Sequence, residues 1–235
     1  MITEQEWAII QLSLQVAGLS VLISLPAGLF VAYCLARWEF TGKSFIDAFV
    51  HLPLVLPPVV VGYALLVVFG QQGVLGHWLE AHWGWVVAFR WTGAAIASAV
   101  MSFPLMVRAM RLSIESIDQR LEAAAKTLGA GVLGVWFTVT LPLALPGIIT
   151  GVVLAFARSL GEFGATITFV SNIPGETQTL PLAIYSLWQV PGAEPAAFRL
   201  CILSLLVSFA ALWFSQVFVS QAQRRVRGQD AISER

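Results

Sequence analysis

Charged residues are scarce in this sequence. Only 11% of the 235 residues are charged, whereas 58% are hydrophobic and the mean hydropathy is +0.81. Soluble domains carry roughly a quarter charged residues, and one of this length could not bury so much apolar surface. The composition therefore excludes an ordinary soluble domain and predicts an all-α integral membrane protein, since a helix satisfies its own backbone groups in lipid. Nothing in it indicates a nucleic-acid partner.

Residues for covalent or metal chemistry are also few. Cys34 and Cys201 stand alone inside apolar runs, without C-x-x-C spacing, and we interpret them as small hydrophobic residues. The histidines His51, His77 and His82 are too scattered to propose a metal site. The sequence has no G-x-x-x-x-G-K-[ST] loop, so it is not expected to hold ATP phosphates. We expect no catalytic residue, no metal and no cofactor in this chain.

Long apolar runs dominate what is present. A transmembrane helix needs about 20 mainly apolar residues. Five stretches qualify, near 9–36, 46–70, 90–110, 138–160 and 197–220. The acidic start and the length of the first run argue against a cleaved signal peptide, so we expect that run to be a retained span. Prolines inside the runs predict kinks in a packed bundle, and Gly147 and Gly151 form a G-x-x-x-G pair suited to close helix approach.

The basic residues predict the orientation, because positive charge favours the cytoplasmic side. With five spans, most of them fall on one side: Arg37, Lys43, Arg108, Arg111, Arg120, Lys126, Arg224, Arg225, Arg227 and Arg235. The opposite side has the acidic N-terminus and the connections 71–89 and 161–196, which contain no Lys or Arg. We therefore expect a single domain over 1–235, with its N-terminus outside and its C-terminus inside. It would have a cytoplasmic loop at 111–137 and a cytoplasmic tail at 221–235.

The 161–196 connection has an irregular pattern. Residues 163–170 are apolar but too short to span, 171–177 have the composition of a turn, and 180–190 predict another short apolar helix. Two interpretations fit this pattern. The segment is either a partly re-entrant or interfacial helix pair on the outer face, or a well-packed outer loop.

The cytoplasmic stretch 116–131 predicts a short helix with two distinct faces. Leu121, Ala125 and Leu128 fall on one face, and Asp118, Glu122 and Lys126 fall on another. Repeated alanines keep one side of the helix slim, and Gly129 and Gly131 permit a sharp change of direction after it. A slim helix of this kind suits insertion into a groove on another protein. Periodicity alone nevertheless favours an ordinary surface helix between spans.

A family resemblance favours the docking helix over the ordinary surface helix. The residues Glu122-Ala-Ala-Ala-Lys-Thr-Leu-Gly129, followed by Val139-Thr-Leu-Pro142, resemble the EAA loop of ABC-importer permeases. Two positions depart from the general pattern, since Ala123 stands where it has Glu and Val139 where it has Ile. A glutamate one position earlier, as at Glu122, is similar to the molybdate and sulfate branch. The blocks 51–62, 101–109 and 154–165 resemble molybdate permease subunits, the last being shared with sulfate and thiosulfate permeases, and 166–177 with 181–185 is similar to the molybdate type.

The resemblance implies a set of partners and coupling residues. The helix would dock into a cleft of a cytoplasmic ABC ATPase dimer, which would hold the ATP and Mg. Its coupling residues would be Glu122, Ala123, Ala124, Ala125, Leu128, Gly129, Leu141 and Pro142. A second copy of the chain would complete the pathway in the inner membrane, and a periplasmic binding protein would deliver molybdate or tungstate.

Two other functions stay open at this point. A sulfate or thiosulfate permease would use the same machinery. A self-contained ion-coupled carrier is a further alternative, although such carriers often show internal repeats and this chain has none that we detect.

Ionisable residues at membrane depth are candidates for the ion pathway. Arg158 and Glu162 are four residues apart and can meet on one helix face. They are either a mutually compensating pair near the outer interface, or a place where Arg158 provides a positive field for a dianion. Polar residues that could line the route without fixing the ion are Thr166, Thr168, Ser171 and Asn172.

Overall fold

The computed structural model describes residues 3–233 and the side chains of residues 3–213, and within that range the chain forms helices and no strand. The elements are α1 (Glu4–Arg37), α2 (Lys43–Val55), α3 (Pro58–Phe69), α4 (Val74–Trp83), α5 (Trp91–Glu115), α6 (Gln119–Thr127), α7 (Val132–Val135), the π-helical turn η1 (Trp136–Thr140), α8 (Leu141–Leu160), α9 (Gly164–Val170), α10 (Leu180–Trp188) and α11 (Glu194–Ser233). The arginine side chains of the predicted 221–235 tail lie outside the described side chains.

The predicted number of spans agrees with the helices. Within the described residues, four segments are long and apolar enough to cross a membrane: Glu4–Arg37, Trp91–Glu115, Val132–Leu160 and Glu194–Trp213. A fifth is present if the bent pair α2 and α3 forms one span. The chain is therefore an all-α protein with four to five candidate spans.

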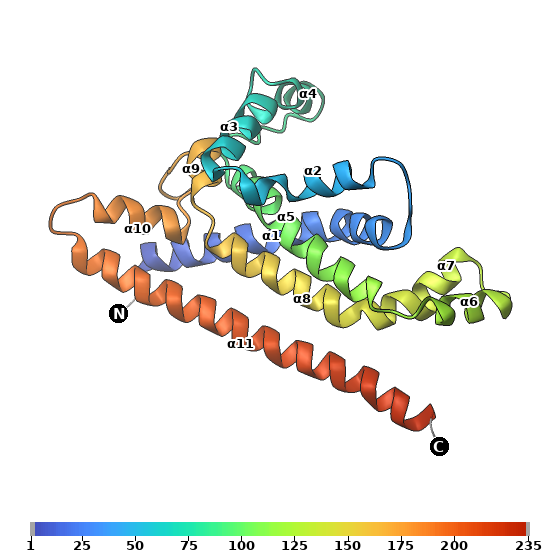
Figure 1. Ribbon diagram of the computed structural model, residues 1–235. Helices are drawn as coiled ribbons and strands as arrows, with labels where there is room; N and C mark the ends of the chain where they lie inside the picture. The colour runs from blue at the N-terminus through green and yellow to red at the C-terminus, as the bar shows by residue number, and fades with distance from the viewer. Residues whose placement is uncertain (1–2, 234–235) are drawn as a thin grey trace.

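The second predicted span is not one continuous helix. Between α2 and α3 the chain bends by 111°. Leu56 and Pro57 at the break are extended, with ψ of 143° and 131°. A residue that precedes proline is pushed out of the helical region, and here Leu56 precedes Pro57 and Pro57 precedes Pro58. The double proline thus divides the 46–70 run, and α3 continues in a new direction (Figure 1).

The centre of the bundle is formed by α1, α5 and α8, which pack on one another along their lengths. The G-x-x-x-G pair has the predicted role at the contact of α5 with α8. A side chain at Gly147 would overlap Ser113, and a Cβ at Gly151 would lie 3.0 Å from the carbonyl oxygen of Met106. Ser20 of α1 and Ser159 of α8 also join by a buried hydroxyl hydrogen bond of 2.8 Å.

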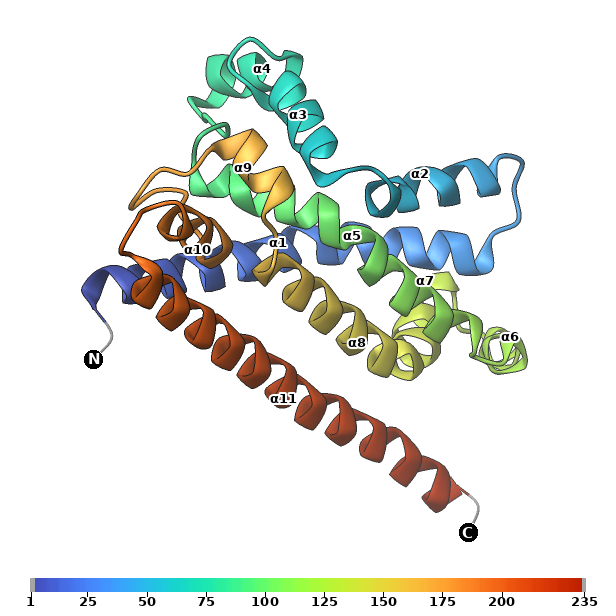
Figure 2. The same ribbon diagram turned by 60° about the vertical axis from the view of Figure 1, so that its left-hand side comes forward.

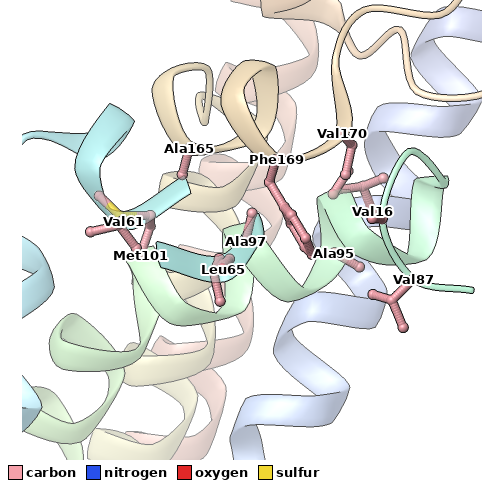
Figure 3. Close-up of a cluster of buried hydrophobic side chains, with 12 residues drawn as sticks. Val16, Val61, Leu65, Val87, Ala95, Ala97, Met101, Ala165, Phe169 and Val170 are labelled. Atoms are coloured by element: carbon pink, nitrogen blue, oxygen red, sulfur yellow. The ribbon is translucent and has the colours of Figure 1, made fainter. Parts of the chain in front are cut away.

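The segment 161–196 contains two short helices, as the pattern predicts. Helix α9 packs between α3 and α5, and its fully buried Phe169 lies in a cluster with Leu65, Ala95 and Val170 (Figure 3). A Cβ at Gly62 would lie 2.5 Å from the Ala165 carbonyl, so α3 and α9 are in close contact. Helix α10 packs instead on α1 and α11.

The functional loops gather at two ends of the bundle. Helices α6 and α7 lie at one end, together with the last residues of α1 and α5, whereas the N-terminus and α10 lie at the other (Figures 1 and 2). Figure 2 shows α11 running along one side between these ends. The basic residues of the linkers 37–43 and 111–126 are therefore at the same end, in agreement with the predicted sidedness.

Candidate functional site

The predicted cytoplasmic helix is present as α6, with a defined cap at each end. Asp118 accepts a hydrogen bond from the backbone N–H of Arg120 at 2.9 Å and so satisfies one free donor of the first turn. At the other end, the N–H groups of Gly129 and Ala130 donate to the carbonyls of Lys126 and Ala125, both at 3.0 Å. This Schellman arrangement needs a left-handed residue, and Gly129 has a φ of +89°. The predicted change of direction is confirmed at Gly129.

The apolar face of α6 points away from the bundle. Leu128 is 88% exposed, and Val132 and Leu133, at the start of α7, are each 72% exposed. Ala123 and Ala124 are also exposed, and their small side chains keep this surface of α6 slim. An ordinary surface helix would place such residues inward, because burying apolar area stabilises the fold. The exposed row Leu128, Val132 and Leu133 is thus left uncovered by the described part of the chain.

The acidic residue of the motif points inward instead. The side chains of Glu122 and Arg37 are 11% and 7% exposed. Glu122 Oε1 accepts hydrogen bonds from Arg37 Nη2 at 2.8 Å, from Arg37 Nε at 3.1 Å and from the Thr140 hydroxyl at 3.0 Å. Asp118 and Lys126, which share the predicted polar face with Glu122, are exposed. Glu122 therefore holds α6 against α1 and η1.

The remaining predicted coupling residues continue into the first span after the loop. Leu141 packs against a buried cluster of α1, α5 and α8, and Pro142 lies in the first turn of α8. The turn before them, η1, has π-helical geometry, which occurs frequently at functional sites. Its Trp136 forms an edge-to-face pair with Tyr33 of α1, with ring centroids 4.7 Å apart.

Sequence reasoning did not find Arg37, Thr140, Val132 or Leu133. Arg37 entered only as a charge for orientation, and the structure shows that it is a buried partner. One signal could have found it. A glutamate that is buried where a helix packs on a membrane bundle needs a cationic partner. This chain has few Lys and Arg residues, so few candidates for that partner exist.

The predicted outer pair is present. Arg158 Nη1 lies 2.6 Å from Glu162 Oε2, with the glutamate side chain almost fully buried and that of arginine 29% exposed. Glu162 also accepts a hydrogen bond from the backbone N–H of Ala165 at 2.9 Å, in the first turn of α9. The pair thus joins the end of α8 to the start of α9, and a positive field from Arg158 is compensated by its partner.

The four polar path candidates differ in exposure and in hydrogen-bond partners. The hydroxyls of Thr166 and Thr168 donate to the carbonyls of Phe163 and Gly164, at 2.8 and 2.9 Å. Ser171 is exposed and has a φ of 64° at the end of α9. Asn172 Nδ2 donates to the Leu182 carbonyl and the Ser186 hydroxyl, which fastens the loop to α10. Their part in a pathway stays a prediction.

The chain is thus a bundle with four to five candidate membrane spans and a slim, exposed apolar helix end at one side. Residues 24–224 match the family described as "Binding-protein-dependent transport system inner membrane component", and the chain belongs to this family of multi-pass inner-membrane proteins.

Individual relatives carry a more specific description. The "Molybdenum transport system permease protein ModB" of Escherichia coli (strain K12) is 60% identical over 215 residues, covering 92% of this chain and 94% of that protein. The Haemophilus influenzae protein with the same description is 55% identical over 229 residues, or 97% of this chain and 100% of that protein. Among solved structures, a bacterial alginate ABC transporter in complex with an alginate pentasaccharide-bound periplasmic protein shares the fold. Its TM-score is 0.72 at 19% identity, with 95% of this chain and 80% of that chain covered.

Proposed function

We propose that this chain is the permease subunit of an ATP-driven importer for molybdate or the similar oxyanion tungstate. The observation that carries the proposal is the 60% identity over 92% of the chain with a molybdenum transport permease. The second such relative, at 55% identity, extends over 97% of the chain. Similarity at this level over the whole length includes both the loop at 111–137 and the outer segment at 161–196.

The exposed end of α6 supports an ATPase as the cytoplasmic partner. Leu128, Val132 and Leu133 offer an apolar row on a helix that alanines keep narrow. Such a row is suited to a hydrophobic cleft. In this proposal the partner holds the ATP and Mg, and closure of the partner displaces α6.

Two further partners follow from the proposal. Four to five spans are few to enclose a pathway, so a second copy of the chain would form the other wall. A periplasmic binding protein would deliver the anion at the end that carries α10, opposite to α6. The Arg158–Glu162 pair lies away from the α6 end and would attract an anion only if the glutamate is displaced from the arginine.

Uptake in cells tests the function. The chain is expressed with its own ATPase and binding protein in an Escherichia coli strain that lacks its molybdenum permease, and cellular molybdenum is measured by mass spectrometry. We expect molybdenum accumulation at low external molybdate, and suppression by excess tungstate but not by excess sulfate. Suppression by sulfate alone would make this a sulfate permease, and molybdate uptake by the purified chain in liposomes without an ATPase would make it a carrier.

A matched pair of variants tests the docking face. Leu128→Asp should abolish accumulation and release the ATPase from purified complexes, because a charge would be buried in an apolar contact. Gln119→Asp places the same charge nine residues earlier on α6, about two and a half helical turns away and thus on the opposite side. It should transport normally. Equal loss in both variants would contradict docking through the Leu128 face.

A further inference from the structure

Helix α6 has a non-covalent connection to α1 besides its covalent connections toward α5 and α8. The connection passes through one carboxylate oxygen of Glu122, which accepts hydrogen bonds from Arg37 and from Thr140. Arg37 Nη2 also donates to the carbonyl of Ile117 at 3.3 Å, in the turn between α5 and α6. A single ion pair therefore joins α1, the turn after α5, α6 and η1.

The environment makes this pair different from the other ion pairs at the same end of the bundle. Its side chains are 7% and 11% exposed, whereas Arg111 and Asp47, paired at 2.9 Å between α5 and α2, are 24% and 37% exposed. Buried ion pairs are held by low dielectric and several hydrogen bonds, and they tolerate little separation of the charges. Relative movement of α6 and α1 would leave each charge without its counter-ion.

A second contact lies one helical turn earlier on α1. Tyr33 precedes Arg37 by four residues, so both project from one face of the helix. Tyr33 packs on Trp136 of η1 with ring centroids 4.7 Å apart. The last turns of α1 are thus attached both to α6 and to the turn that leads into α8.

Helix α1 extends from this attachment to the opposite end of the bundle (Figures 1 and 2). There Ser13 accepts a hydrogen bond from the backbone N–H of Leu180, the first residue of α10, at 2.8 Å. Glu6 Oε1 accepts a hydrogen bond from Arg199 Nε of α11 at 2.6 Å. Movement of α1 along or about its axis would therefore reach α10 and α11.

We infer that Arg37 and Glu122 are positioning residues that make α6 move together with α1. Displacement of α6 by the partner then reaches the outer end through α1 directly, in addition to α5 and α8. This inference rests on the proposed function, because it needs an ATPase that moves α6. It also separates the roles of the motif: Leu128 faces the partner, whereas Glu122 faces the permease.

The test measures how many anions are transported for each ATP hydrolysed, in proteoliposomes that contain the chain, its ATPase and its binding protein. Arg37→Gln and Glu122→Gln remove one charge and keep a hydrogen-bonding side chain. We expect ATP hydrolysis to continue and the transport-to-hydrolysis ratio to fall about tenfold in both. Arg111→Gln is the matched control, because it removes a paired arginine at the same end whose partners, Asp47 and Glu115, lie on α2 and α5. Its ratio should stay at the wild-type value.

Charge exchange distinguishes a positional role from a requirement for one particular residue. The double variant Arg37→Glu with Glu122→Arg should recover at least a third of the wild-type ratio, whereas Arg37→Glu alone should not. If the neutral variants fail to accumulate in the membrane, Arg37→Lys and Glu122→Asp replace them, with an intermediate ratio expected. An unchanged ratio in variants that assemble would overturn the inference. Absence of ATP-dependent transport by the wild-type complex would instead contradict the proposed function.

Discussion

Substitutions at Gly129 test whether the end of α6 sets the position of Leu128. The residue has a φ of +89°, and a Cβ there would meet nothing within 4 Å. The effect of a side chain is therefore backbone strain and not collision. An alanine in the left-handed region costs about 1–2 kcal/mol, and asparagine and aspartate tolerate it better. This strain competes with the two hydrogen bonds that close the helix on Lys126 and Ala125.

The size of the effect follows from that strain. About 1–2 kcal/mol changes the ratio of closed to frayed helix ends roughly 5–30-fold. Helix α6 is at the edge of the molecule, so the bundle itself does not depend on this equilibrium. We expect Gly129→Ala to lower molybdate uptake by up to that factor and Gly129→Asn to lower it less. Gly129→Asp adds a charge beside Leu128, whose burial costs several kcal/mol, and uptake should fall below detection.

The assay is initial-rate uptake of molybdate, normalised to the amount of chain in the membrane. All three variants should reach wild-type amounts, because no contact in the spans changes. Co-purification with the ATPase should follow the same order, with Asn above Ala and Ala above Asp. Normal transport by the aspartate variant would refute the assignment of Gly129 and Leu128 to the coupling face. Equal losses for Asn and Asp would show that backbone conformation, and not charge, dominates.

Three further substitutions address the bundle. In Gly147→Val the new side chain overlaps that of Ser113. The free energy of unfolding should fall by about 1–3 kcal/mol, with a lower melting temperature in detergent. Glu162→Ala leaves Arg158 without its partner at 2.6 Å and should destabilise by about 3–5 kcal/mol in the same assay. Ser13→Ala removes the acceptor for the first N–H of α10 and should cost about 1–3 kcal/mol, with faster hydrogen exchange in α10.

Each of these has a control. Gly18→Val should be better tolerated than the change in α8, because a Cβ at Gly18 meets nothing within 4 Å. The double variant Arg158→Gln with Glu162→Gln should be more stable than Glu162→Ala. If this double variant is stable and yet transports poorly, the Arg158–Glu162 pair has a role in the pathway. Unchanged transport would show that the pair is structural. Ser116→Ala removes an exposed hydroxyl and should leave exchange in α10 unchanged.

Several features could be predicted from the sequence because they depend on local properties. Hydropathy and run length determine that the chain is an all-α membrane protein with about five apolar runs. The turn at Gly129 and the close approach at Gly147 follow from the absence of a Cβ, which is a property of the residue itself. The family resemblance also follows from residue identities at 122–142, and the family of the chain is confirmed by the match over 24–224.

The shape of the second run depended on more distant contacts. The prolines predict a kink near residue 57, but the 111° bend also reflects where α3 finds a partner. That partner is α9, about a hundred positions later, and the contact at Gly62 is close enough to exclude a Cβ. The predicted kink in the 46–70 run is therefore present, whereas the direction of its second half depends on the contact of α3 with α9.

Periodicity determined that α6 has two faces, but not which of them faces the bundle. Only the tertiary structure decided that Leu128 points outward and Glu122 inward. The reason is the position of Arg37, which lies 85 residues earlier in the chain and is brought to Glu122 by the packing of α1 against α5 and α8. A buried carboxylate is stable only beside such a partner, and a helical pattern contains no information about a cation on another helix.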